Sequence, residues 1–212
     1  MAELLVASGG ETLSDALDSL RLPTFAGLPL TIRVPTGSHE LPTTYLTFDN
    51  ETLASEVWLV GDPGAAVVFA ANNSGTGGRG LHASSRGGHG RRMQGGAQHP
   101  PKSPGVVLKI LPGAPPIHLH GLHLSGRLEL LGGSASLYNC TLDGTNLEGT
   151  PVGIQALGGT LKLNMTDVVH FEGGGVSVSA GGVDIDGGTL RGNGAMPTAT
   201  FGGLQVGRSD GG

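Results

Sequence analysis

The sequence has little charge, few aromatic side chains and a single cysteine. Charged residues make up 14% and aromatic residues 4% of the 212 residues, and the formal net charge is −5. Such a weakly acidic chain has no general attraction for nucleic-acid phosphates or anionic membranes, so we expect no nucleic-acid partner. The lone Cys140 cannot form an internal disulfide and is predicted to be a small core residue.

Long apolar runs are also missing. No window approaches the roughly 18 consecutive apolar residues of a membrane-spanning helix. The first ten residues lack a basic start and have only a short apolar run, so we expect no secretory signal in this chain. Asn-X-Ser/Thr triplets, which suit a secreted glycoprotein, occur at Asn50, Asn72, Asn139 and Asn164. The location stays open, with the cell surface or extracellular space as the working hypothesis.

Glycine and proline, by contrast, are abundant. The 40 Gly and 13 Pro together make 53 of 212 residues, a quarter of the chain, which argues against a helical bundle. One short amphipathic helix is predicted within 8–20, from the spacing of Leu13, Ala16, Leu17 and Leu20. After Pro23 the apolar period changes to two, which predicts short strands.

Four regions follow from these patterns. We expect a capping helix and lead-in at 1–29 and the first coils of strands at 30–71. Residues 72–105 contain ten glycines and five basic residues but hardly an aliphatic side chain, so they are predicted to be a disordered insertion. Further coils are expected at 106–212. Because no cap is evident after Val206, we expect either a fragment of a longer protein or an end that pairs with another chain.

An internal repeat is the strongest signal in the chain. Three segments match position for position and a fourth is a looser copy: 117–126, 135–144, 183–192 and 161–168. Each has an alternating strand, a one-residue corner at Gly121, Asn139 or Gly187, and a second short strand. A third strand precedes each copy, ending in Gly-Gly in three cases. Gly and Asn tolerate the left-handed backbone that a sharp corner needs. The fold class predicted is all-β, a right-handed parallel β-helix with three short strands per coil and a short N-terminal capping helix.

These residues resemble the right-handed parallel β-helix group, the pectin-lyase-like superfold. The stretch Gly188-Thr-Leu-Arg-Gly-Asn-Gly-Ala195, followed by Gly202-Gly-Leu-Gln-Val206, is similar to the repeats of polymorphic outer-membrane proteins and of algal surface β-helices. The resemblance covers roughly residues 10–70 and 106–210. It implies a fold and a helix that closes one end, but not one function, because the superfold hosts lyases, hydrolases and adhesins.

Candidate binding residues lie on the outward face of the first strand of each copy: His118, His120, Tyr138, Lys162, Asn164, Asp184 and Asp186. His118 and His120 are two residues apart on a strand and share a face, which makes them candidates for a zinc or copper pair. His123 follows the corner and is expected to point elsewhere. Asp184 and Asp186 form a similar pair that offers a calcium ion only part of its ligands, so no cofactor is expected, with calcium as the alternative.

Catalysis is the alternative hypothesis. In this superfold the catalytic groups are expected on the strand that ends in Gly-Gly, whose outward column reads Glu129, Gln155, Ser177 and Gln205. Lyases and hydrolases need clustered carboxylates or a basic residue, and this column has one carboxylate. A polysaccharide lyase or glycoside hydrolase would therefore depend on Asp184, Asp186 and Glu129, with His118 and His120, or on coils outside this chain.

The function predicted is a non-catalytic β-helix module of a surface or extracellular protein. It would present polar strand faces for adhesion or weak contact with a polysaccharide or glycoprotein surface, and many weak contacts would add up. A structural spacer is the second alternative. End-to-end self-association through the C-terminal coil is a further partner hypothesis.

Overall fold

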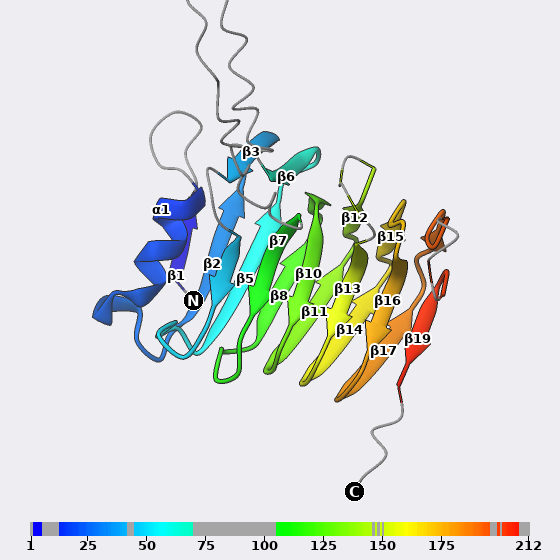
Figure 1. Cartoon of the computed structure of the whole chain (residues 1–212). Coiled ribbons are helices and arrows are strands. Elements are labelled where there is room, and N and C mark those ends of the chain that lie inside the picture. The colour runs from blue at the N-terminus through cyan, green and yellow to red at the C-terminus, as the bar shows by residue number, and fades with distance from the viewer. Residues whose placement is uncertain are drawn as a thin grey trace, which may run out of the picture.

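The computed structural model describes residues 2–5, 13–41, 45–69, 105–145, 147, 149, 151–195, 199 and 201–207. Within them the chain is a parallel β-helix with three strands per coil, as the repeat predicted. The coils stack from the N-terminal helix to the last strand (Figure 1). The predicted insertion lies outside the described residues, Gly105 excepted, so its disorder stays a prediction.

Three parallel sheets run along the stack, and each coil contributes one strand to each of them. Sheet A consists of β1 (Ala2–Leu5), β2 (Pro29–Val34), β5 (Glu56–Gly61), β8 (Ile117–His120), β11 (Ser134–Tyr138), β14 (Thr160–Asn164) and β17 (Gly182–Asp186). Sheet B consists of β3 (Gly37–Leu41), β6 (Ala65–Phe69), β9 (His123–Ser125), β12 (Thr141–Asp143), β15 (Asp167–Val169) and β18 (Leu190–Arg191). Sheet C consists of β4 (Leu46–Phe48), β7 (Val106–Ile110), β10 (Arg127–Leu130), β13 (Val152–Ala156), β16 (Gly174–Val178) and β19 (Leu204–Val206).

Six coils result, numbered here from the N-terminus by their sheet A strands β2, β5, β8, β11, β14 and β17. In the sequence, residues 70–104 separate the sheet B strand of the second coil, β6, from its sheet C strand, β7. The region predicted at 30–71 therefore holds the first coil and two strands of the second, whose third strand, β7, follows the predicted insertion.

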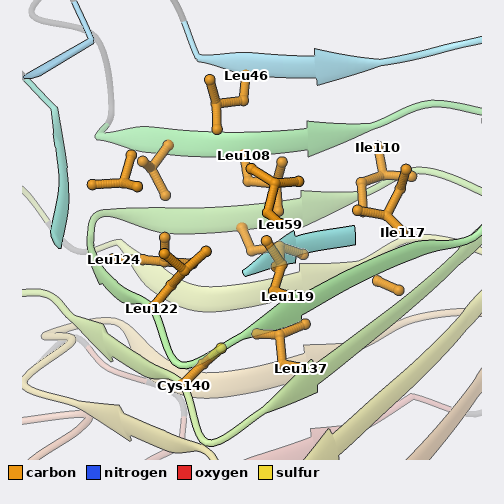
Figure 2. Close-up of a cluster of buried hydrophobic side chains, with 14 of the residues drawn as sticks. Leu46, Leu59, Leu108, Ile110, Ile117, Leu119, Leu122, Leu124, Leu137 and Cys140 are labelled. Carbon is orange, nitrogen blue, oxygen red and sulfur yellow. The ribbon is translucent and has the colours of Figure 1, made fainter. Parts of the chain in front are cut away.

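Apolar side chains form continuous rows inside the solenoid because equivalent strands pair in register. One row of sheet A runs Ile32, Leu59, Leu119, Leu137, Leu163 and Ile185. The first five members are at most 1% exposed, and Ile185 at the last coil is partly exposed. Figure 2 shows Leu59, Leu119 and Leu137 of this row packed near apolar side chains from the other two sheets, among them Leu108, Ile110 and Leu124. Cys140 is buried there, as predicted, and burial raises the pKa of its thiol.

The corner between sheets A and B has the left-handed backbone that the sequence predicted. Gly121, Asn139 and Gly187 have φ angles of 67°, 49° and 72°. The equivalent residue in the looser copy is Met165, with φ 49°. A methionine is not expected there because a left-handed conformation is strained for most residues with a Cβ atom. The Met165 side chain is 60% exposed, so a large side chain fits there, but the left-handed backbone remains unfavourable for it.

A short helix covers the N-terminal end of the solenoid, as predicted (Figure 1). Helix α1 spans Leu13–Asp18 and continues as a 3-10 turn, Ser19–Arg21, with a second such turn at Pro23–Phe25. Leu13, Ala16 and Leu20 are buried in the core. The chain enters through β1, which pairs with β2 and which the sequence pattern did not reveal. None of the described helices is long and apolar enough to cross a membrane.

Candidate functional site

The outer face of sheet A brings the predicted binding residues together in two columns. The first column reads Thr31, Trp58, His118, Ser136, Lys162 and Asp184. The second reads Arg33, Val60, His120, Tyr138, Asn164 and Asp186. The repeat predicted the order of these columns from His118 and His120 onward. It did not extend the columns to Trp58 and its neighbours. Aligning Val57-Trp-Leu-Val60 with Ile117-His-Leu-His120, which alternate in the same way, would have put Trp58 in the column of His118.

Three rings of these columns form an aromatic cluster, defined here as Trp58, His118 and Tyr138. The Trp58 and His118 rings stack with centroids 4.2 Å apart and planes 14° apart. Tyr138 lies 6.3 Å from Trp58 and 6.5 Å from His118, with nearly parallel planes. Because it is almost equidistant from both, the tyrosine lies beside the stacked pair and does not extend it. The cluster is an apolar area on an otherwise polar face.

His118 is enclosed by this cluster and by Glu56 of the neighbouring strand. Its Nε2 lies 2.8 Å from Oε1 of Glu56, and its side chain is only 15% exposed. Neither ring nitrogen makes a well-directed hydrogen bond to any described residue, so the contact with Glu56 is close but poorly aligned. Burial lowers the pKa of His118, an effect that the Glu56 carboxylate partly opposes. The ring is therefore held largely neutral at pH 7.

Among the described residues, no third metal ligand lies beside His118 and His120. His120 lies in the neighbouring column between Val60 and Tyr138, and His123 lies on sheet B, as expected from the corner. In the described part of the chain no group of three or more His, Cys, Asp or Glu side chains is placed to hold a metal ion.

The far end of sheet A is more strongly charged. Lys162 is in register with Asp184, and the amide Nδ2 of Asn164 donates a 3.0 Å hydrogen bond to Oδ2 of Asp186. These side chains are exposed or partly exposed, and they form a polar ladder on the outside of coils 5 and 6. The neutral amide of Asn164 is thus the hydrogen-bond partner of Asp186. Calcium binding by Asp184 and Asp186 stays a prediction.

Glu129 lies on a different face, in an outward column of sheet C with Thr47, Lys109, Gln155, Ser177 and Gln205. It makes ion pairs with Arg127 and with Lys109, whose Nζ is 3.5 Å from Oε2. Lys109 also lies over the Tyr45 ring, 5.2 Å from its centroid. With a cation on each side, Glu129 is placed as a member of a structural ion-pair cluster on the outside of sheet C. Glu129, on sheet C, is not brought together with Asp184 and Asp186, on sheet A.

A further cluster, which the sequence analysis missed, lies where two neighbouring strands of sheet B, β12 and β15, end. Oδ1 of Asp143 accepts hydrogen bonds from the backbone N and the hydroxyl of Thr145, at 2.9 and 2.6 Å. It also lies 3.1 Å from Nδ1 of His170, whose backbone is left-handed at φ 61°. Burial opposes ionisation of Asp143, but the hydrogen bonds from Thr145 and His170 outweigh it and lower its pKa.

That arrangement fixes a loop and does not form a nucleophile. The Thr145 hydroxyl and the Asp143 carboxylate both approach the same nitrogen of His170, at 3.1 Å each. A hydrolase triad needs the carboxylate on one imidazole nitrogen and the hydroxyl on the other. The cluster therefore ties the start of the loop after β12 to the end of β15.

A shallow pocket lies where the N-terminal helix meets sheet C. It is lined by Leu17, Asp18, Arg21, Tyr45, Leu46, Thr47 and Thr52. Its one cation, Arg21, is paired with Asp49 at 3.1 Å and lies 3.8 Å from Glu51. No residue predicted from the sequence to bind a ligand lies in it.

In comparisons with protein-family profiles, curated proteins and solved structures, no match to this chain was found.

Proposed function

We propose that this protein is a non-catalytic β-helix module of a surface or extracellular protein, and that it contacts polysaccharide through the outer face of sheet A. The pectin-lyase-like group is the superfold to which we assign it, on the repeat style and the corner residues. The proposal concerns a binding face, because the fold alone does not determine an activity.

One observation carries the proposal: two columns of polar and aromatic side chains run in register along the same face. Equivalent strands of a β-solenoid lie about 4.8 Å apart, so the columns present their side chains at a regular spacing. A polymer with a repeating unit can make several such contacts at once, and their free energies add. The aromatic cluster supplies the apolar part of the contact, and Lys162, Asn164 and the two aspartates supply hydrogen-bonding groups.

The separation of the carboxylates favours binding over catalysis. Glycoside hydrolysis uses two carboxyl groups roughly 5–10 Å apart across the bond that breaks. Glu129 lies on sheet C of coil 3, and Asp184 and Asp186 lie on sheet A of coil 6. The two aspartates lie two residues apart on one strand and point from the same face, so they do not flank a bond from opposite sides.

The test is to incubate the purified protein with a panel of neutral and acidic polysaccharides, with calcium and with chelator. Binding is measured by affinity electrophoresis, and turnover by new reducing ends and by unsaturated uronate absorbance. We expect retention without turnover. Turnover that is lost in Asp184→Ala would replace the proposal with the lyase or hydrolase, and neither retention nor turnover would leave the structural spacer.

A further inference from the structure

Trp58 has one ring face that its stacking partner does not use. His118, from the following coil, stacks on one side of the indole at 4.2 Å. The opposite side of the indole is turned toward the preceding coil, where the residue in register is Thr31. A threonine side chain is too short to cover an indole ring. This face of Trp58, above Thr31, is therefore suited to receive a flat ligand.

The groups around this face match a sugar ring. A pyranose has an apolar face of C–H groups and a rim of hydroxyls, so it packs on an aromatic ring whose edges carry hydrogen-bonding groups. Thr31 supplies a hydroxyl in the same column, and Glu56, on the same strand as Trp58, supplies carboxylate oxygens. The Glu56 side chain is 37% exposed, so its oxygens remain accessible beside the cluster.

Charge narrows the class of sugar. The Glu56 carboxylate lies against the His118 ring, next to the stacked pair, and it would repel a uronate or a sulfate held on Trp58. A neutral sugar meets no such repulsion.

We propose that Trp58 and Thr31 form a subsite for a pyranose ring of a neutral polysaccharide, and that Glu56 disfavours acidic glycans. This rests on the proposed function of sheet A as a glycan-binding face. It adds the position of the contact and the class of sugar.

The experiment compares retention of the full chain in gels that contain soluble β-glucan or galactomannan with retention in gels that contain polygalacturonate or alginate. We expect Trp58→Leu to weaken binding of the neutral polymers roughly three- to tenfold, the loss expected for one aromatic contact. Thr31→Gln keeps the indole but covers its free face, and we expect a similar loss. Glu56→Gln should raise binding of the acidic polymers relative to the neutral ones.

The matched control is Tyr45→Leu, which removes an exposed aromatic ring from the sheet C side and should not change retention. Circular dichroism and thermal melting establish that each variant is folded, and Thr31→Gln provides the test if Trp58→Leu is not. Neutral binding that survives both Trp58→Leu and Thr31→Gln would overturn the subsite but not the proposed function. Acidic polymers bound as tightly as neutral ones would overturn the role of Glu56, and retention by no polymer would overturn the proposed function itself.

Discussion

Coils 4 and 6 share one sequence pattern but bury it to different depths. Ala135 and Leu137 of coil 4 are fully buried, whereas their equivalents in coil 6, Val183 and Ile185, are partly exposed. The contrast is stronger on sheet C, where Leu204 of coil 6 is 45% exposed. Within the described chain, coil 6 pairs with a neighbour on one side only.

The comparison shows that burial in a solenoid has two separate causes. The alternation of apolar and polar residues decides which side chains point inward. The presence of a coil above and below decides how completely they leave water, because each repeat packs only on its neighbours. A residue's contribution to stability should therefore depend on its coil as well as on its type.

The largest expected effect comes from truncating two neighbours of one core row. Leu163→Ala in coil 5 should cost about 2–5 kcal/mol, because the side chain is fully enclosed. Ile185→Ala, in register with it in coil 6, should cost clearly less because its side chain is already partly hydrated. The measurement is the free energy of unfolding from urea titration. Equal costs would show that coil 6 is buried in solution.

A corner substitution comes next and tests the backbone instead of the core. Gly121→Ala should cost about 1–2 kcal/mol, because its φ is 67° and a Cβ would lie 3.1 Å from the carbonyl oxygen of Gly61. The control is Gly203→Ala in coil 6, where φ is not positive and a Cβ meets no atom within 4 Å. Thermal melting of both variants is the check, and similar losses at the two sites would contradict the role of the left-handed corner.

The pH dependence of His118 is a smaller effect. The pKa of His118 is lowered from 6.5, so the unfolded chain binds a proton at a pH where the folded chain does not. The free energy of unfolding should therefore fall as pH decreases below about 6.5, until the folded histidine is protonated as well. His118→Gln should remove this part of the slope between pH 7 and pH 5, measured by urea titration at each pH. An unchanged slope would mean that His118 titrates normally in the fold.

The smallest effect is expected at the cluster of Asp143, Thr145 and His170. Asp143→Asn should cost under about 1 kcal/mol at pH 7, since the pair with His170 is partly exposed to solvent. The pKa of Asp143 is lowered from 3.8, so its stabilising effect should disappear as pH falls below that value and the carboxyl takes up a proton. Asp184→Asn, on the exposed face of coil 6, is the control that should change little. A cost for Asp143→Asn that does not diminish as the pH is lowered below 3.8 would contradict the ionic origin of the effect.

Much of the architecture was predictable from local patterns. The repeats at 117–126, 135–144 and 183–192 predicted the strands, the register and the corners at Gly121, Asn139 and Gly187. Such features depend on a period of two and on residues that tolerate positive φ, and both are properties of a few neighbouring residues. The left-handed Met165 was not predictable, because the coil imposes its conformation against the preference of the residue.

The candidate site divides in the same way. The sequence by itself determined that His118, Tyr138, Lys162 and Asp184 face outward, because each alternates with an inward apolar residue. Only the tertiary structure decided that Trp58 stacks on His118, that Glu56 lies against the same ring, and that Lys109 pairs with Glu129. The two members of each pair belong to neighbouring coils that are separated by a long stretch of sequence. The stacking of these coils is what brings them into contact.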